Sequence, residues 1–196
     1  MSSRLIVNSI RHTGASSDAI SLDSSGNVTC NGTATAFGGG KILQVDQVTK
    51  TDTASTTSNT YEDISGLSQA ITTVAGSKVF CMGSLYFGST PSYSTWFRLV
   101  RVDVDGSTNY PYLGDADGST TRASAGNYNS YYSYVAEYSA FHFLDTPSGA
   151  GLHTYKIQWL QGYSGYTSYL GRDKQGSTSA SRGRVPSSLT LIEVGA

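Results

Sequence analysis

The sequence has little charge and no cluster of positive residues. Of its 196 residues, 14% are Asp, Glu, Lys or Arg, against roughly 25% in an average soluble protein. The 13 Lys and Arg are scattered, and the net charge is -1. A nucleic-acid-binding protein concentrates positive charge against phosphates, so this class is excluded. Polarity comes instead from Ser, Thr, Gly, Asn and 14 Tyr, a mixture typical of adhesive β-proteins.

Targeting segments and cysteine patterns are also missing. The apolar core of the N-terminal stretch is three residues long, too short for a signal peptide, and no stretch approaches transmembrane length. We therefore expect synthesis in the cytoplasm and no insertion into a membrane. Cys30 and Cys81 lie in different strand-like runs and match no metal-ligand spacing. Buried free thiols are expected.

Catalytic motifs are absent as well. The sequence contains no G-x-S-x-G, no H-E-x-x-H and no P-loop. No Asp/Glu pair stands out as a glycosidase dyad, although folding could assemble one in space. Residues 103–109 and 115–120 are superficially like calcium loops, but both lack the terminal Glu. Asp-Gly is a strong hairpin signal, so we interpret both as turns. We expect no enzyme activity, no metal and no cofactor.

Three consecutive glycines at 38–40 divide the chain. Glycine is costly inside a strand or helix, so these residues predict a hinge between a segment at 1–40 and a main domain at 41–196. The segment contains a strand-like run and then a hairpin with a turn at Gly26. Its alternating apolar residues are candidates for attachment and oligomerisation: Leu5, Val7, Ile10, Ile20, Leu22 and Val28.

The hairpin at 19–32 is too small to cover its own apolar face. Each arm has about three residues, and an isolated hairpin is marginal in water. One solution is three identical chains that wind about a common axis, and another is addition of the strands to a partner's sheet edge. A disordered tail is the alternative, which the regular alternation disfavours. Both structured solutions bury Ile20, Leu22 and Val28 against other chains.

The main domain has the pattern of an all-β protein. Apolar residues nowhere recur at helical spacing over three turns, and strand-like runs alternate with turn residues. The expected strands lie at 41–49, 60–64, 68–74, 78–88, 95–104, 110–115, 137–145, 152–163 and 187–194. This number of strands in about 155 residues predicts a two-sheet antiparallel β-sandwich, with the jelly roll as its commonest version.

Tyrosines gather in two stretches rich in Ser, Gly and Asn. Tyr combines a large rigid contact face with low entropic cost, and its small polar neighbours supply adaptable hydrogen bonds. Such loops suit a binding surface, for example for sugar rings. Alternatively, the rings line a subunit interface or part of a core. The candidate surface-binding residues are Tyr128, Tyr131, Tyr132, Tyr134, Tyr163, Tyr166 and Tyr169.

Two sets of stretches carry a family resemblance. "SRLIVNSIRHTGASSDAISLDSSGNVTCNGTATA" resembles N-terminal segments of virion structural proteins from marine and cyanobacterial tailed phages. "FGGGKILQV", "QVTKTDT", "GLSQAIT", "FRLVR", "YLGDADGS" and "SSLTLIEV" resemble the C-terminal domains of the same group. The resemblance implies a virion protein made in the host cytoplasm, with a trimeric jelly-roll-like head.

These observations predict a non-enzymatic homotrimer on the virion surface, bound to capsid or tail proteins through residues 1–40. It would be a capsid decoration, cement or head-fibre protein, or a short tail fibre. The small size favours decoration, and the Tyr-rich loops favour host adhesion. A lectin-like module that binds host-surface glycan is the alternative, and a polysaccharide hydrolase is less favoured.

Overall fold

The computed structural model describes residues 7–30, 41–90, 93–128, 135–176 and 178–196. The chain divides into two compact units, Met1–Gly39 and Gly40–Ala196. All regular secondary structure among the described residues is β-strand. Leu5 and the glycines at 38–40 lie outside the described residues.

The first unit is a three-stranded antiparallel sheet in the order β1-β2-β3. Its strands are β1 (Ser9–Ile10), β2 (Ile20–Leu22) and β3 (Val28–Cys30). The hairpin expected at 19–32 is β2 and β3, which turn at Gly26 with φ of 85°. Asp23 holds this turn, because its carboxylate accepts hydrogen bonds from the Ser25 and Asn27 amides at 2.9 Å. A hydrogen bond from the Asn27 side chain lowers the pKa of Asp23.

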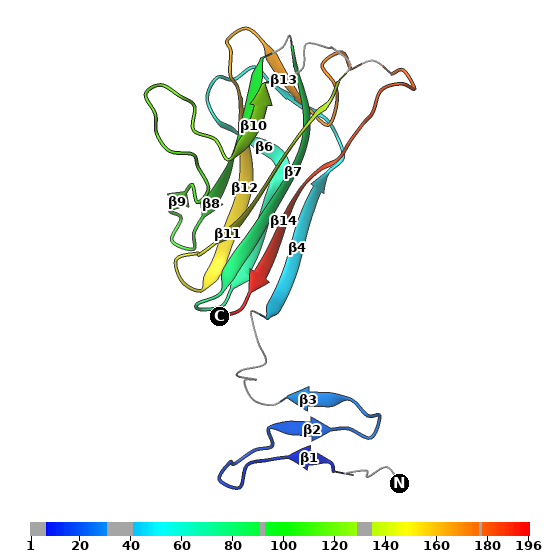
Figure 1. The fold of residues 1–196 in the computed structure, drawn as a ribbon, viewed down its shortest axis with the longest axis vertical. Coiled ribbons are helices and arrows are strands. Elements are labelled where there is room, and N and C mark those ends of the chain that lie inside the picture. Colours follow the sequence, from blue (N-terminus) through cyan, green and yellow to red (C-terminus); the bar gives the residue numbers. More distant parts are fainter. Residues whose placement is uncertain (1–6, 31–40, 91–92, 129–134, 177) are drawn as a thin grey trace. The chain divides into compact units, whose positions relative to one another are not determined.

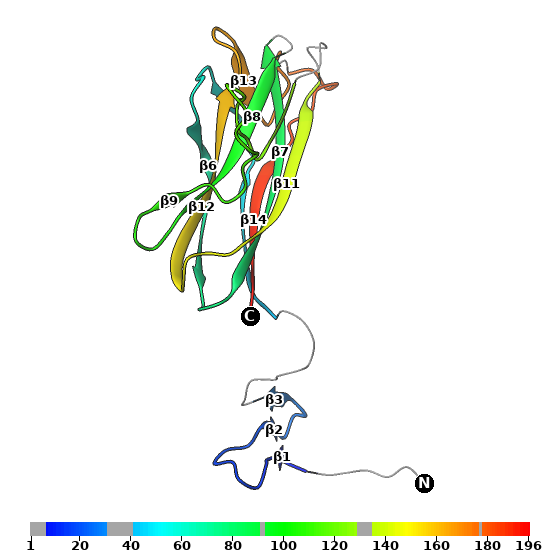
Figure 2. The ribbon, with the colours of Figure 1, turned by 60° about the vertical axis from the view of Figure 1, so that its left-hand side comes forward.

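The second unit, the head, is a sandwich of two antiparallel sheets, visible as two layers in Figure 2. One sheet has the order β6-β12-β8-β10, and in the other β4, β14, β7 and β11 are neighbours. The eight strands named here are β4 (Ile42–Lys50), β6 (Glu62–Thr73), β7 (Lys78–Thr90), β8 (Ser94–Val102), β10 (Ala125–Tyr128), β11 (Glu137–Asp145), β12 (Gly151–Gln161) and β14 (Ser187–Val194), and three short strands extend the two sheets.

The strand pairing is that of a jelly roll. The first of the eight strands pairs with the last, the second with the seventh, the third with the sixth and the fourth with the fifth. A long antiparallel hairpin folded over into two sheets has this connectivity. The pairs β14–β7 and β12–β8 then join the hairpin's arms (Figure 1). The predicted all-β jelly-roll-like sandwich is therefore confirmed.

Several strand boundaries differ from those expected. The runs at 60–64 and 68–74 form one strand, β6, because a bulge places residues 64–67 opposite a single residue of β12. Gly66, with φ of 87°, lets the chain turn there, so that Ile64 and Leu67 are both buried. The run at 110–115 is a loop, not a strand. An aromatic residue of this loop packs against the sheet: Tyr112 stacks on Phe143 of β11, with ring centroids 4.9 Å apart.

Four short strands were not expected from the sequence. They are β5 (Ala54–Thr56), β9 (Thr108–Asn109), β13 (Thr167–Leu170) and the edge strand β10 already named. Each has only two to four residues, too few for alternation to show. β14 pairs with the first half of β7, and β13 pairs with the second half of the same strand. β5 then pairs with the other edge of β13.

The core lies between the two sheets and follows the alternation seen in the sequence. Phe87 of one sheet meets Phe97 of the other edge-to-face at 5.0 Å. β14 is central, between β4 and β7, as expected from its apolar residues. Cys81 is a buried free thiol, and burial raises its pKa. The cluster also contains Val79, Leu85, Leu99, Phe141, Tyr155, Ile157, Trp159, Leu170, Leu189 and Leu191.

Candidate functional site

Four tyrosines meet at one end of the head. Tyr93 is central: its ring lies 4.5 Å from that of Tyr163, 4.3 Å from that of Tyr166 and 6.3 Å from that of Tyr128. Tyr93 immediately precedes β8, and Tyr128 is the last residue of β10. Tyr163 and Tyr166 belong to the β12–β13 connection. We call these four residues the tyrosine cluster.

The local backbone brings these segments together. The Gly162 amide donates a hydrogen bond to the Ser94 carbonyl at 2.8 Å, and a Cβ at Gly162 would overlap the Ser94 hydroxyl. Glycine is therefore needed for the β12 exit to approach the start of β8. Tyr128 pairs in register with Ser94, which fixes the third segment.

The tyrosine cluster is partly open to solvent. Tyr128 is 59% exposed and Tyr163 55%, while Tyr93 and Tyr166 are half-buried. A hydrogen bond with Tyr166, followed by the charge interaction with the same phenol, raises the pKa of Tyr93, so Tyr93 keeps its proton at neutral pH. The cluster therefore offers ring faces and hydroxyl groups without charge, which suits a neutral, polar ligand with apolar patches.

The structure gathers some of the predicted tyrosines and separates others. Tyr128, Tyr163 and Tyr166 come together, whereas Tyr169 lies apart, with its ring 4.3 Å from the Arg172 guanidinium carbon. Tyr131, Tyr132 and Tyr134 lie outside the described residues. Sequence reasoning missed Tyr93, the centre of the cluster. Its context, "TPSYST", has the same polar small residues, and that was the available signal.

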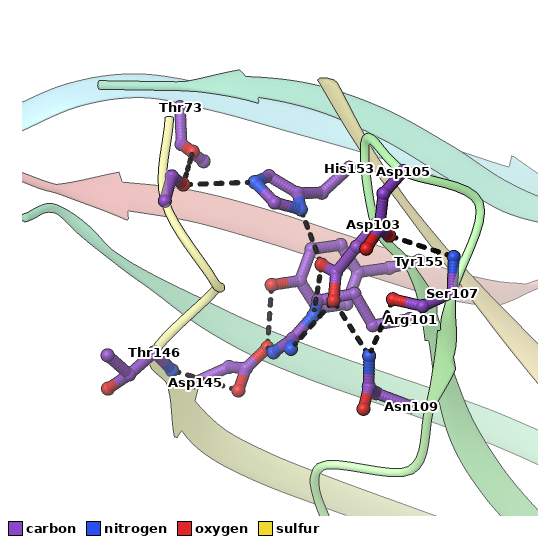
Figure 3. Close-up of polar contacts among 11 residues, drawn as sticks. Thr73, Arg101, Asp103, Asp105, Ser107, Asn109, Asp145, Thr146, His153 and Tyr155 are labelled. Atoms are coloured by element: carbon purple, nitrogen blue, oxygen red, sulfur yellow. Dashed lines mark hydrogen bonds and ion pairs between the residues drawn. The ribbon is translucent and has the colours of Figure 1, made fainter. Parts of the chain in front are cut away.

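A second constellation, the buried polar network, lies near the end of β8, away from the tyrosine cluster at the start of that strand. Figure 3 shows its contacts. Arg101 of β8 pairs with Asp103 through Nε at 2.7 Å and Nη2 at 3.1 Å. Its Nη1 lies 2.5 Å from Asp145 Oδ2, at the end of β11 in the other sheet. The Tyr155 hydroxyl of β12 donates to the same Asp145 oxygen at 2.7 Å. His153 Nδ1 lies 2.7 Å from Asp103 Oδ1. All five residues are buried.

The pKa shifts in this network follow from burial and ion pairing. Burial by itself raises the pKa of Asp103, but the hydrogen bonds from Arg101 and His153 outweigh it and lower the pKa. Burial likewise opposes the charge of Arg101, yet its two carboxylate partners raise its pKa. Burial and then the charge of Asp145 raise the pKa of Tyr155. Asp103 therefore stays ionised beside the Arg101 guanidinium.

The buried polar network joins strands of both sheets. His153 Nε2 lies 3.3 Å from the Gly149 carbonyl oxygen, so both ring nitrogens contact oxygen atoms of the protein. Asn109 donates to Asp103 Oδ2 at 2.7 Å, and the Thr146 amide donates to Asp145 Oδ1 at 2.8 Å. Both carboxylates are thus saturated by protein donors. The network ties β8 and β12 of one sheet to β11 of the other.

The two Asp-Gly stretches are turns. In the first, Asp105 accepts a hydrogen bond from the Ser107 amide at 2.9 Å, and Gly106 has φ of 81°. In the second, the Thr120 amide donates to the Asp117 carbonyl at 2.9 Å. Within the described ranges, no group of three His, Cys, Asp or Glu side chains is placed to hold a metal ion.

The predicted attachment residues that are described lie in the small sheet. The register places Ile10 opposite Ile20, and Leu22 opposite Val28, so these four share one face. Ile10 is 51% exposed and Val28 62%. Ile20, Leu22 and the preceding Val7 are half-buried.

Comparisons with known proteins give little. No family model matches the chain, and no curated protein matches it. Among solved structures, the chain is similar to one described as "Structure of infectious bursal disease virus Gx strain", with a TM-score of 0.36 and 13% identity. The match covers 95% of this chain and 45% of that one, so the chain spans less than half of that protein's length. A similarity this low carries no argument about function.

One further result concerns membranes. The described part of the chain contains no helix with the length and apolar character needed to cross a bilayer.

Proposed function

We propose that the protein is a non-enzymatic structural protein of the phage virion surface. It assembles as a homotrimer, is held to capsid or tail proteins through residues 1–40, and projects its jelly-roll head. The observation that carries this proposal is the apolar face of the small sheet. Ile10, Ile20, Leu22 and Val28 share that face, and none of them is buried within its own chain. Such a face calls for other chains to cover it.

Residue 41 and the tyrosine cluster lie at opposite ends of the head, which fits attachment at one end. The β4 strand, which follows the segment at 1–40, begins at the end where the C-terminus lies (Figure 1). The Gly195 amide donates to the Lys41 carbonyl there at 2.8 Å. The tyrosine cluster lies at the opposite end of the head, near β13. A head joined through residue 41 would therefore present its tyrosines away from the join.

The family resemblance supports the virion assignment, and the direct join between residues 1–40 and the head favours one role within it. The head begins directly after residue 40, so no extended shaft lies between residues 1–40 and the head. A capsid decoration, cement or head-fibre protein fits this better than a long adhesive fibre. A short tail fibre is the other role. Copy number on intact particles separates the two, because capsid decorations are far more numerous than tail components.

The test is the attachment segment. Burying an Ile, Leu or Val side chain stabilises by about 1.5–3 kcal/mol, so several on one face can anchor a chain. We expect a variant that lacks residues 1–32 to keep a folded head and to be absent from purified particles. Particles carrying the truncated protein at normal copy number would refute attachment through this segment.

A second candidate function, binding of host-surface glycan, is favoured by the tyrosine cluster. Exposed, uncharged ring faces beside hydroxyl groups suit the apolar faces of sugar rings. Tyr163→Ala and Tyr128→Ala should each weaken binding of the full-length protein to a glycan array. Tyr110→Ala is the matched control, because Tyr110 is also an exposed tyrosine but lies outside the cluster. Equal binding by all three variants would reject the cluster as a glycan site. Turnover of a bound polysaccharide would instead indicate a hydrolase.

A further inference from the structure

The two outer faces of the sandwich have opposite chemistry. On the β6-β12-β8-β10 sheet, Asp63 accepts hydrogen bonds from Lys156 at 2.7 Å and from Gln158 at 2.5 Å. Arg98 donates to Gln158 at 2.8 Å and stacks on Tyr61, 4.1 Å from the ring centroid. Burial, partly offset by the charge of Arg98, raises the pKa of Tyr61 to about 12. This face carries the paired polar groups expected where an antiparallel sheet meets water.

The other outer face, formed by β4, β14, β7 and β11, has fewer charged groups, and its polar side chains include His142 and a Gln47–Thr190 hydrogen bond of 2.7 Å. One cross-strand row consists of Leu144, Phe80, Ile192 and Val45, in register on four neighbouring strands. Leu144 is 46% exposed and Val45 58%. Among the described residues that point outward from these strands, Lys78 is the only Asp, Glu, Lys or Arg. Depletion of charge together with exposed apolar side chains characterises the centre of a protein–protein interface.

The surface of this outer face is uneven, with a hollow beside a pair of large side chains. Two rows above the apolar row, Ala140, Ser84 and Ser188 lie in register, and their small side chains leave a hollow of about 330 Å³. Tyr86 and Tyr138, with rings 4.8 Å apart, lie beyond the small residues. A ridge beside a hollow gives the face a shape that another protein surface can fit closely.

The size of the face is sufficient for a stable contact. Four strands about 4.8 Å apart, each with about eight residues rising 3.4 Å, cover a projected area of roughly 500 Å². The accessible area of such a pleated surface is larger than its projection. A standard interface buries about 800 Å² on each partner, so this face supplies most or all of the area of one such contact, and in a trimer two neighbours share it.

We propose that the outer face of β4, β14, β7 and β11 is where neighbouring copies of this chain pack in the homotrimer. This inference rests on the proposed trimer and assigns its contact surface. A second copy is the chosen occupant because the area fits subunit packing and the face has almost no charge with which to select a charged partner. The ridge formed by Tyr86 and Tyr138 and the hollow beside it lie on the same molecule. Two identical copies therefore bring both features to the contact.

The test compares two leucines on opposite faces. Leu144 lies on β11 in the proposed interface, and Leu152, 54% exposed, points outward from β12 on the polar face. We would measure the mass of the full-length protein, Leu144→Asp and Leu152→Asp by sedimentation at micromolar concentration. Val45→Asp, on the opposite edge of the same face, is an independent second variant. Far-UV circular dichroism and melting would establish that each variant is folded, with Leu144→Gln in reserve.

The expected result is a trimer for the unmodified protein and Leu152→Asp, and a single 20.7 kDa chain for Leu144→Asp and Val45→Asp. Trimers of all four proteins would overturn this face as the contact and leave the trimer intact. A monomeric unmodified protein would overturn the trimer itself, and the face assignment with it. Loss of trimer in Leu152→Asp as well as Leu144→Asp would also overturn the assignment, because the effect would not depend on the face.

Discussion

Arg101 is the residue whose loss should most damage the head. It is buried and holds two buried carboxylates, Asp103 through two hydrogen bonds and Asp145 through one. Arg101→Met keeps much of the side-chain volume but removes the charge and all three bonds. Two buried carboxylates would remain in the core without the guanidinium that pairs with both of them.

The cost follows from the imbalance of charge. Removing one partner of a buried ion pair costs about 3–5 kcal/mol, because the other charge stays buried and uncompensated. For a domain of this size, that lowers the melting temperature by roughly 6–20 °C. The cost should shrink as pH falls. Arg101 lowers the pKa of Asp103 against the effect of burial, so without Arg101 this carboxyl takes up its proton, and loses its charge, at higher pH than in the unmodified protein.

The assay is urea unfolding of the full-length protein at pH 7 and pH 4.5, with Lys156→Met as the control. Lys156 also pairs with an aspartate, Asp63, at 2.7 Å, but both side chains are partly exposed. Such surface pairs contribute at most about 1 kcal/mol. A loss for Arg101→Met no greater than that for Lys156→Met would refute the reasoning. A loss that grows between pH 7 and pH 4.5 would do the same.

Three further predictions address other parts of the chain. Gly83→Ala should destabilise the head by about 1–3 kcal/mol, because a Cβ there would overlap the Phe141 ring; Phe141→Leu in the same chain should restore part of the loss in thermal melts. Burial opposes the charge of Glu193, but hydrogen bonds from Ser77 and its other partners outweigh it and lower the pKa. The stability that Glu193 contributes should therefore be complete above pH ~4.3 and be lost as pH falls through the lower folded pKa, and Glu193→Gln should show a shallower decline in acid unfolding. Leu22→Asp should leave the head's melting temperature unchanged and abolish attachment to particles, whereas normal copy number on particles would contradict a buried role for Leu22.

Part of the fold and of the candidate site was predictable because local patterns carry it. Alternation placed Phe97 and Leu99 in one strand and Tyr155, Ile157 and Trp159 in another, and all five are buried. Gly26 between two short alternating runs predicted the β2–β3 hairpin. Asp-Gly predicted the turns at 105–106 and 117–118. In each case the determining interactions lie within a few residues, so the sequence alone specifies them.

Tertiary structure decided everything that depends on distant segments. The alternation that buries Ile157 also points Arg101, Asp145 and His153 inward, but nothing in the sequence pairs them, because they come from strands in two sheets. Tyr93 joined Tyr128 and Tyr163 only when β8, β10 and β12 met at one end of the head. Likewise, Leu144, Phe80, Ile192 and Val45 each look like ordinary strand residues. The register of four strands aligns them into one row, and that register is set by long-range pairing, not by local preference.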